Sequence, residues 1–306
     1  MSTVTEAPTI GLSSLDHLWF QVAGTRCNLT CTHCFISCSP KNDLFGFLSL
    51  EQVKRSLEES VAHGVKEYYF TGGEPFLNPD MVPILVESLR YGTTTVLTNA
   101  TVFKDAWLEA LAEADRCSQY KLEFRVSIDG FSPETNDPIR GEGTFDRAIK
   151  GIVKLLEFGF APIITATRTW PCDQESQVVG NFEKMLVSLG YESPRLKILP
   201  SLKLGAEVER TSGYCDSQRI TERMMTSFDK TQLLCDHSRI VTDKGVYVCP
   251  ILIDSPEAKM GETLAETFGE FPLKFGACYT CYQYGAICSN PSTDAPKSCG
   301  TSCSDA

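Results

Sequence analysis

The chain has 306 residues, 42% of them hydrophobic, which is typical of a folded protein with a large apolar core and excludes a disordered or fibrous chain. Its formal net charge of −11 disfavours a nucleic-acid partner, because an acidic surface repels phosphate backbones. No apolar run is long enough to span a bilayer, and residues 1–14 have neither the basic start nor the apolar stretch of a signal peptide, so we expect a cytoplasmic protein without a membrane partner.

Strand and helix patterns alternate from residue 17 to residue 200. A strand at 17–23 precedes a cysteine-bearing loop, and a helix at 49–63 begins with Ser49 three residues before Gln52, the spacing of a capping box. Residues 66–75 predict a strand that runs into a Gly-Gly turn. The remaining strands are expected at 93–99, 121–129, 162–169 and 195–200, and the remaining helices at 79–91, 104–115, 143–159 and 175–190.

Six strands separated by helices predict a parallel sheet wound in one hand. Six units are too few to close an eight-stranded barrel. We therefore expect an α/β fold with an open (β/α)6 sheet, a partial TIM barrel, whose reactive face lies at the carboxyl ends of the strands.

The fourth predicted strand, 121–129, has one apolar and one polar face. Alternate residues form each face, with Leu122, Phe124, Val126 and Ile128 on one and Glu123, Arg125, Ser127 and Asp129 on the other. Parallel strands that are buried on both sides are usually apolar throughout. The polar face therefore indicates a wet interior that holds a ligand, and the alternative is an edge strand that faces solvent.

The character of the chain changes after residue 201. A helix at 216–230 is expected to lead into two short strands around an Asp-Lys-Gly turn, and the rest is rich in Cys, Gly, Pro and Ser. We expect a small α+β appendage that has too few apolar residues for a core of its own. The predicted division is an N-terminal extension, a partial barrel, an appendage and a flexible tail, at 1–16, 17–205, 206–290 and 291–306.

Fourteen cysteines are distributed unevenly along the chain. Four lie within residues 27–38, eight lie from Cys215 onward, and Cys117 and Cys172 lie between them. Clustered cysteines in a reducing compartment are typically metal ligands or redox groups. The distribution predicts two metal-rich regions joined by an ordinary scaffold, in which Cys117 and Cys172 are ordinary cysteines and Cys117 is buried.

The segment RCNLTCTHCF, just after the first predicted strand, places Cys27, Cys31 and Cys34 at C-x3-C-x2-C spacing. Three thiolates on one short loop can bind three irons of a [4Fe–4S] cube and leave the fourth iron open for a ligand. A catalytic metal keeps an open position in the same way. The alternative is a zinc site in which His33 or Cys38 supplies the fourth ligand.

This spacing, with His33 directly before the third cysteine, resembles the radical SAM superfamily. The resemblance implies that the open iron binds the amino and carboxylate groups of S-adenosylmethionine (SAM), with His33 beside the cofactor. It also implies that one electron from the cluster cleaves SAM to methionine and a 5′-deoxyadenosyl radical, which abstracts a hydrogen atom from the substrate. The cofactors supply this chemistry, and the protein positions and shields the radical.

Two motifs at later strand ends support the same site. YFTGGEP ends the second strand, where two glycines let the backbone approach a ligand and Glu74 can accept a hydrogen bond from an ammonium group. By the resemblance, Gly72, Gly73 and Glu74 hold the methionyl amine; taken alone, the glycine pair is only a turn. Asn99, at the end of the third strand, resembles a position near the adenosyl pocket, with a helix-capping Asn as the alternative.

Polar residues at and after the fourth strand extend the resemblance. It assigns Ser127 and Asp129 to the carboxylate and ribose of SAM. The stretch DPIRGEG matches the family's D-x-x-R-G pattern, which makes Arg140 a carboxylate partner; an exposed arginine before a helix is the alternative. Arg168, near the end of the fifth strand, either reaches the substrate or pairs on the surface.

The second cysteine region contains four candidate ligands. The predicted hairpin brings Cys235 and Cys249 close together, and Cys278 and Cys281 form a C-x2-C pair. The pattern resembles the auxiliary-cluster appendage of the twitch and SPASM subfamilies, with one residue fewer between Gly245 and Cys249, and it implies a second [4Fe–4S] cluster with four protein ligands. A four-cysteine zinc ribbon fits the same spacing. Either metal would help this segment to fold.

Three cysteines remain near the C-terminus, Cys288, Cys299 and Cys303, and two others, Cys38 and Cys215, have no assigned role. The tail does not have the compact spacing of a further cluster, which favours a single auxiliary cluster. The tail cysteines could ligate an additional metal, hold a thiophilic substrate or only oxidise. The sequence leaves these alternatives open.

These patterns predict a radical SAM oxidoreductase or transferase. Its auxiliary cluster would accept an electron from the substrate radical or bind the substrate, and a small-molecule substrate is favoured over a peptide. A reductant such as flavodoxin or ferredoxin would supply the electron. The alternative from another class is a non-catalytic iron–sulfur or zinc protein, such as an electron carrier or metal-loading factor, which would not need the Gly-Gly-Glu turn.

Overall fold

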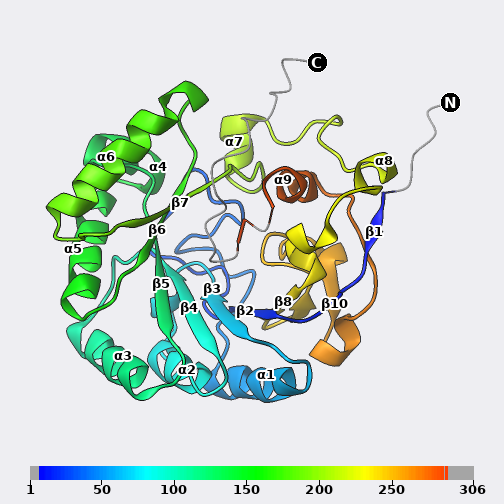
Figure 1. Ribbon diagram of the computed structural model, residues 1–306, viewed down its shortest axis with the longest axis horizontal. Helices are drawn as coiled ribbons and strands as arrows, with labels where there is room; N and C mark the ends of the chain where they lie inside the picture. Colours follow the sequence, from blue (N-terminus) through cyan, green and yellow to red (C-terminus); the bar gives the residue numbers. More distant parts are fainter. Residues whose placement is uncertain (1–6, 286, 289–306) are drawn as a thin grey trace.

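Six parallel strands form the centre of the structure, a computed structural model that describes residues 7–285, 287 and 288 (Figure 1). Each of these strands pairs in parallel with the next one along the chain. They lie where the sequence predicts strands: β2 (His17–Gln21), β3 (Glu67–Thr71), β4 (Thr93–Thr98), β5 (Leu122–Ser127), β6 (Ile163–Thr167) and β7 (Arg195–Leu199). The predicted α/β fold with an open sheet of the partial TIM-barrel type is confirmed.

Helices follow the strands and cover the outer face of the sheet, as Figure 1 shows. The predicted ones are present: α1 (Leu50–Ala62), α2 (Met81–Ser88), α3 (Asp105–Cys117), α5 (Thr144–Glu157) and α6 (Glu175–Ser188). Ser49 caps α1, and its side chain and that of Gln52 each accept from the other's backbone N–H, so the capping box is confirmed. Among the described residues, no helix is both long and apolar enough to cross a bilayer.

Strand β5 separates the apolar core from an internal cavity. Phe124 and Val126 are buried in the core between the sheet and the outer helices. Arg125 and Ser127, on the opposite face, line the cavity. Because β4 and β6 flank β5 on both sides, the alternative of a solvent-facing edge strand is wrong.

The predicted hairpin is present, but it extends the sheet of the barrel. Strands β8 (Ser238–Thr242) and β9 (Gly245–Tyr247) pair antiparallel around the Asp-Lys-Gly turn, and β10 (Lys259–Gly261) pairs with β9. Strand β8 also pairs in parallel with β2, so the described strands form one sheet in the order β10-β9-β8-β2-β3-β4-β5-β6-β7. The cysteine-rich region is therefore held against the first barrel strand, and the domain boundary at residue 205 stays a prediction.

The prediction of a helix at 216–230 is wrong. Only α8 (Glu222–Met225) is helical there, apart from a single 3-10 turn that begins at Lys230, because Ile220, Met225 and Phe228 anchor irregular chain to an apolar cluster. Three helices were not predicted from the sequence: α4 (Pro133–Arg140), α7 (Glu207–Thr211) and α9 (Gly276–Tyr284), of which α9 carries Cys278 and Cys281. Gly, Cys and Tyr are weak helix formers, which explains why the pattern of α9 was not evident.

The C-terminal region shares its apolar core with the barrel. A second apolar cluster packs residues of β8, β9 and α9 against Trp19 and Tyr69 of the barrel. The N-terminal strand β1 (Thr9–Ile10) pairs with β11 (Phe271–Pro272), which closes this region from the other side. Cys249, Cys278 and Cys281 are buried within the cluster, so any metal there would be enclosed by apolar side chains.

Candidate active site

The cysteine loop opens onto a cavity of about 1000 Å³ at the carboxyl ends of the barrel strands. Cys27 is buried, while Cys31 and Cys34 are half-buried. The structure brings most of the predicted SAM-site residues to this one cavity, where its walls include Cys27, Cys31, Cys34, His33, Gly72, Gly73, Asn99, Ser127 and Arg140. Residues that lie more than a hundred positions apart in the chain thus surround one space, as a cofactor site requires.

The Gly-Gly turn packs directly against the cysteine loop. The Gly73 N–H donates to the Gly24 carbonyl at 3.0 Å, and the Glu74 N–H donates to the Arg26 carbonyl at 2.9 Å. A Cβ atom on Gly73 would lie 1.9 Å from the Arg26 carbonyl oxygen. Only glycine therefore lets the turn approach the loop that carries Cys27.

We expect Gly73→Ala to lower the free energy of unfolding by about 1–3 kcal/mol, because the added methyl group must push the cysteine loop away. The same variant should hold less iron after reconstitution. Gly180→Ala on α6 is the matched control, since a Cβ there meets nothing within 4 Å; it should raise stability by about 0.4–1 kcal/mol. Chemical denaturation and iron analysis of both variants measure the effects, and equal stability of the two would contradict the close packing.

Asn99 and Glu74 connect the turn, strand β4 and the cysteine loop. The Asn99 side-chain amide donates to the Cys27 Sγ at 3.8 Å, and its backbone N–H donates to the Glu74 carboxylate at 2.8 Å. The same carboxylate accepts from the Thr98 hydroxyl at 2.7 Å and the Phe76 N–H at 3.1 Å. Glu74 is fully buried, which raises its pKa to about 7. Its side chain holds the β4 end in place, and contact of Glu74 with a methionyl amine stays a prediction.

Asp129 is a buried anchor for two residues of the site. Its Oδ2 lies 2.5 Å from the Arg140 Nε and 2.7 Å from the His33 Nε2, and its Oδ1 accepts from the Thr167 N–H at 2.7 Å. Despite burial, the charges of Arg140 and His33 and these hydrogen bonds hold the Asp129 pKa well below its usual range. In this arrangement Asp129 positions Arg140 and His33, and its predicted contact with the ribose is not tested.

Cys38 lies beside the third cysteine of the loop. Its N–H donates to the Cys34 Sγ at 3.2 Å, and hydrogen bonding from Cys38 lowers the Cys34 pKa to about 6. Burial raises the pKa of Cys27 to about 12 and that of Cys31 to about 11. Bound iron would reverse these two shifts, because a coordinating thiol is deprotonated by the metal. Cys38 thus contacts Cys34, a candidate cluster ligand, through its backbone N–H.

Four cysteines from the C-terminal region line a separate, smaller cavity of about 360 Å³. Cys235 precedes β8, Cys249 follows β9, and Cys278 and Cys281 lie one turn apart on α9. The other walls are aliphatic and aromatic side chains and one alanine, among them Leu233, Ile251, Leu252, Phe271 and Leu273. Burial raises the pKa of Cys235, Cys249 and Cys278 to about 12, and it raises the pKa of Cys281 well above its usual range. Cys235 and Cys249 of the predicted hairpin and the two cysteines of the C-x2-C pair therefore line the same cavity.

The donor set fits an iron–sulfur cube. Four enclosed thiols with apolar surroundings match the four-cysteine ligation of a [4Fe–4S] cluster, and the apolar shell excludes solvent from it. Within the described part of the chain, no three His, Cys, Asp or Glu side chains converge closely enough to hold a single metal ion. The thiols of a cube bind four separate irons and need not converge on one point.

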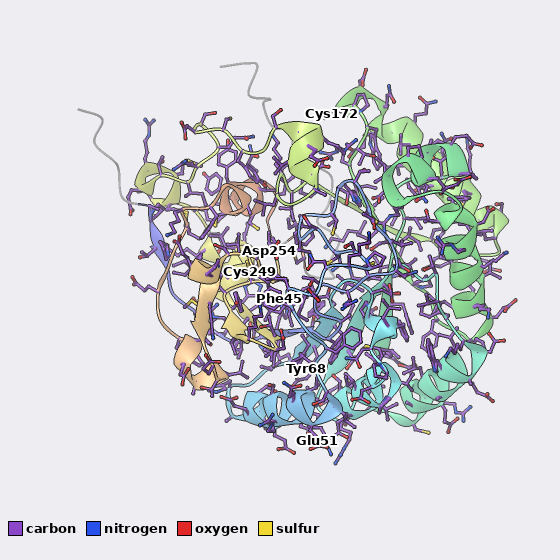
Figure 2. The ribbon with its side chains drawn as sticks, turned by 180° about the vertical axis from the view of Figure 1, so that it is seen from behind. Phe45, Glu51, Tyr68, Cys172, Cys249 and Asp254 are labelled. Atoms are coloured by element: carbon purple, nitrogen blue, oxygen red, sulfur yellow. The ribbon has the colours of Figure 1, made fainter. Side chains whose placement is uncertain are left out.

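The remaining predicted residues have varied positions. Arg168 pairs with the Glu175 carboxylate at 2.5 and 2.9 Å, both side chains are mostly buried, and a contact of Arg168 with the substrate stays a prediction. Cys117 is exposed at the end of α3, and the prediction that it is buried is wrong. Cys172 and Cys215 each take part in a disulfide, so neither is a free thiol. Figure 2 shows Cys172 at the periphery and Cys249 in the interior. Cys299 and Cys303 lie outside the described residues.

Three buried residues near the cavities were not singled out from the sequence. Arg125 lies on the polar face of β5, Lys197 lies on β7, and Trp19 lies on β2. All three are less than 5% exposed. The alternation along β5 was the available signal for Arg125, whereas nothing local distinguishes Trp19 or Lys197 from ordinary strand residues.

The sequence matches a known family over the barrel. Residues 22–170 match the family model of the radical SAM superfamily. The chain is similar to the antilisterial bacteriocin subtilosin biosynthesis protein AlbA of Bacillus subtilis, with 33% identity over 136 residues, 44% of this chain and 29% of that protein. It is also similar to the AdoMet-dependent heme synthase of Methanosarcina barkeri, with 34% identity over 155 residues, 49% of this chain and 41% of that protein. The matches thus span less than half of these relatives.

The fold is shared with solved structures of low sequence identity. SuiB of Streptococcus suis, solved with its precursor peptide SuiA, has a TM-score of 0.63 at 16% identity and covers 85% of this chain and 66% of its own. The anSMEcpe structure with bound AdoMet has a TM-score of 0.61 at 16% identity and covers 82% of this chain and 80% of its own. Residues 22–170 therefore belong to the radical SAM superfamily, and the chain around them shares the fold of these solved structures.

Proposed function

We propose that this protein is a radical SAM enzyme that holds one [4Fe–4S] cluster on Cys27, Cys31 and Cys34. The observation that carries the proposal is that these three thiols share one cavity with Gly72 and Arg140 at the carboxyl ends of the strands. A reduced [4Fe–4S] cluster with bound SAM supplies a 5′-deoxyadenosyl radical that abstracts a hydrogen atom from the substrate. The cavity is large enough for both SAM and part of a substrate.

The chain's own residues would bind and orient these groups. Asn99 donates to the Cys27 sulfur and Cys38 donates to the Cys34 sulfur, and such donors stabilise thiolates on a cluster. Arg140 faces the cavity with its Nε fixed by Asp129, which leaves the rest of the guanidinium for the SAM carboxylate. Gly73 keeps the backbone close to the loop, so the amine of SAM can be bound without a side chain intervening.

We propose a second [4Fe–4S] cluster on Cys235, Cys249, Cys278 and Cys281. The support is that all four thiols line one enclosed apolar cavity. With four protein ligands such a cluster has no open iron, which favours transfer of an electron from the substrate radical over direct binding of the substrate. The overall reaction would then oxidise the substrate, a small molecule or a peptide side chain, with flavodoxin or ferredoxin as the electron donor for the first cluster.

The competing function is a non-catalytic electron carrier. A carrier would need the clusters, but it would not need a cavity of about 1000 Å³ beside three thiols and an anchored arginine. The cavity therefore favours the enzyme.

The test is anaerobic reconstitution with iron and sulfide, followed by reduction with dithionite in the presence of SAM. We expect about eight irons per chain, four for each cube, and formation of 5′-deoxyadenosine measured by liquid chromatography. Clusters that form and are reduced without any cleavage of SAM would leave the carrier as the function. Zinc bound in place of the second cube would replace the auxiliary cluster by a zinc ribbon.

A further inference from the structure

A second cavity adjoins the large cavity onto which the cysteine loop opens, and it extends toward the cysteine-rich region. Its volume is about 670 Å³. The two cavities share several walls, among them Phe35, Leu97, Arg125, Thr167 and Leu199. Pro250, the residue after Cys249, and Cys288 also line the second cavity. A molecule in this cavity would thus contact walls shared with the cysteine-loop cavity and a residue beside a C-terminal thiol, as a substrate that reacts with a radical at the first cluster and passes an electron to the second requires.

Arg125 is the charged group of this second cavity. It projects from β5 and is only 2% exposed. One of its terminal nitrogens donates to the Cys288 carbonyl oxygen. The Arg125 Nε is buried and has no hydrogen-bond partner. A buried guanidinium nitrogen without an acceptor is unfavourable, so a group that supplies an acceptor there is expected to bind.

The described residues that line the cavities around Arg125 carry no carboxylate charge. Among the described residues that line either cavity there is no Asp or Glu. Glu123, the preceding residue on the same face of β5, pairs with Arg195 at 2.8 Å. Lys197 on β7 adds a second positive charge, and burial together with the charge of Arg125 lowers the Lys197 pKa to about 7. Within the described lining of the two cavities, no carboxylate would therefore compete with an anion for Arg125.

Trp19, Gln21 and His33 also line the second cavity, and each has a buried polar atom without a hydrogen-bond partner. The Trp19 Nε1 is a buried donor without an acceptor, and the Gln21 Oε1 is a buried acceptor without a donor. Both residues line the cavity, and the Trp19 ring is fixed by stacking on Tyr69 with centroids 4.3 Å apart. Apart from His33, whose Nε2 lies 2.7 Å from Asp129, the unmatched set is two donors and one acceptor on otherwise mainly apolar walls. A ligand with an anionic oxygen pair and one N–H or O–H group would match all three.

We propose that Arg125 binds a carboxylate of the substrate, and that the substrate is a carboxylic acid with an apolar body and one hydrogen-bond donor. This inference rests on the proposed function, since it assigns the substrate class of the same enzyme. The Nε edge of a guanidinium pairs with the two oxygens of a planar carboxylate, which favours a carboxylate over a larger phosphate on these mainly apolar walls. Arg125 then places the substrate beside SAM without itself taking part in the chemistry.

Binding can be measured without radical chemistry. The protein is reconstituted with its clusters and saturated with SAM, and calorimetry measures the binding of N-acetyl-L-phenylalanine and of N-acetyl-L-phenylalaninamide. The two probes have the same apolar ring and acetamide N–H, and they differ by one carboxylate. We expect the acid to bind at least about tenfold more tightly than the amide, because a charged hydrogen bond supplies that difference.

Arg125→Met should remove this preference for the acid, whereas Arg168→Met should retain it, because Arg168 already pairs with Glu175. The affinity for SAM and the yield of 5′-deoxyadenosine in the absence of substrate should be unchanged in Arg125→Met. These two readouts test the proposed function separately, since SAM cleavage could succeed while the carboxylate site fails. Arg125→Gln provides a second variant if the methionine variant does not fold.

Several outcomes would overturn the proposal. The acid and the amide could bind equally to the unaltered protein, or the preference for the acid could survive in both Arg125 variants while their stability falls, which would make Arg125 only a support for Cys288. A loss of SAM affinity in Arg125→Met would assign the residue to the cofactor. Tighter binding of phenyl phosphate than of the acid would replace the carboxylate by a phosphate.

Discussion

Replacement of Cys27, Cys31 and Cys34 by alanine is expected to reduce 5′-deoxyadenosine formation to the background of the assay. The three thiols are the cysteines that share the large cavity with Gly72 and Arg140, apart from Cys38. Without them the first cube has no ligands at the place where SAM would bind. Liquid chromatography of the reaction products measures the loss. Cys117→Ala is the matched control, because Cys117 is exposed on α3 and should leave the yield unchanged.

The same triple variant separates the two proposed clusters. About four irons should remain per chain, held by the C-terminal cysteines, because those thiols line a separate cavity. Iron analysis and the visible absorption of the residual cluster measure this. A variant without any iron would contradict the second cluster, and continued formation of 5′-deoxyadenosine would contradict the role of the cysteine loop.

Asp129→Asn is expected to lower the free energy of unfolding by about 3–5 kcal/mol, because it leaves the buried charge of Arg140 without a partner. The Asp129 carboxylate has no exposed surface and lies 2.5 Å from the Arg140 Nε. The affinity for SAM should also fall about 10- to 100-fold, as is typical when a residue that orients a ligand-binding group is lost. Chemical denaturation and calorimetric titration with SAM measure the two effects.

The stabilisation that Asp129 contributes to the folded protein is expected to depend on pH. The pKa of Asp129 is lower in the folded than in the unfolded protein. The stabilisation is therefore complete above the unfolded pKa of about 4 and is lost as the pH falls through the folded value. The difference between the unaltered protein and Asp129→Asn should be constant from about pH 5 to 8 and shrink in more acidic solution. Arg116→Ala on the exposed end of α3 should have no measurable effect; a similar loss in both variants would argue against burial as the cause.

The position of Asp129 shows where sequence reasoning stops. Its place at the end of a strand with a polar face could be predicted, and so could its proximity to SAM by resemblance. The sequence does not show that His33, from a loop almost a hundred residues earlier, and Arg140 both approach the same carboxylate oxygen. That arrangement depends on the turn after β5 and on α4, whose interior Pro138 argues against a helix when only the sequence is considered.

The cysteine-rich region shows the same limit. The spacing indicated four candidate cysteine ligands and a hairpin, but it did not indicate that this region attaches to the barrel. Strand β8 pairs with β2 in parallel, with Trp19 opposite Ile240, and this pairing joins residues 221 positions apart. Local patterns determine strands and turns, because they depend on neighbouring residues. Which strand becomes the neighbour of another depends on burial of the whole apolar surface.

By itself, the sequence determined the alternation of strands and helices, the capped start of α1, and the three cysteines with their Gly-Gly turn, because each depends on residues within one short segment. The tertiary structure alone decided that the four C-terminal thiols line one apolar cavity and that Arg125 lies buried with an unpartnered nitrogen. A strand pattern fixes which side of the sheet a residue occupies. Only the packing of all the elements determines what lies opposite it, because burial and charge balance are properties of the assembled fold.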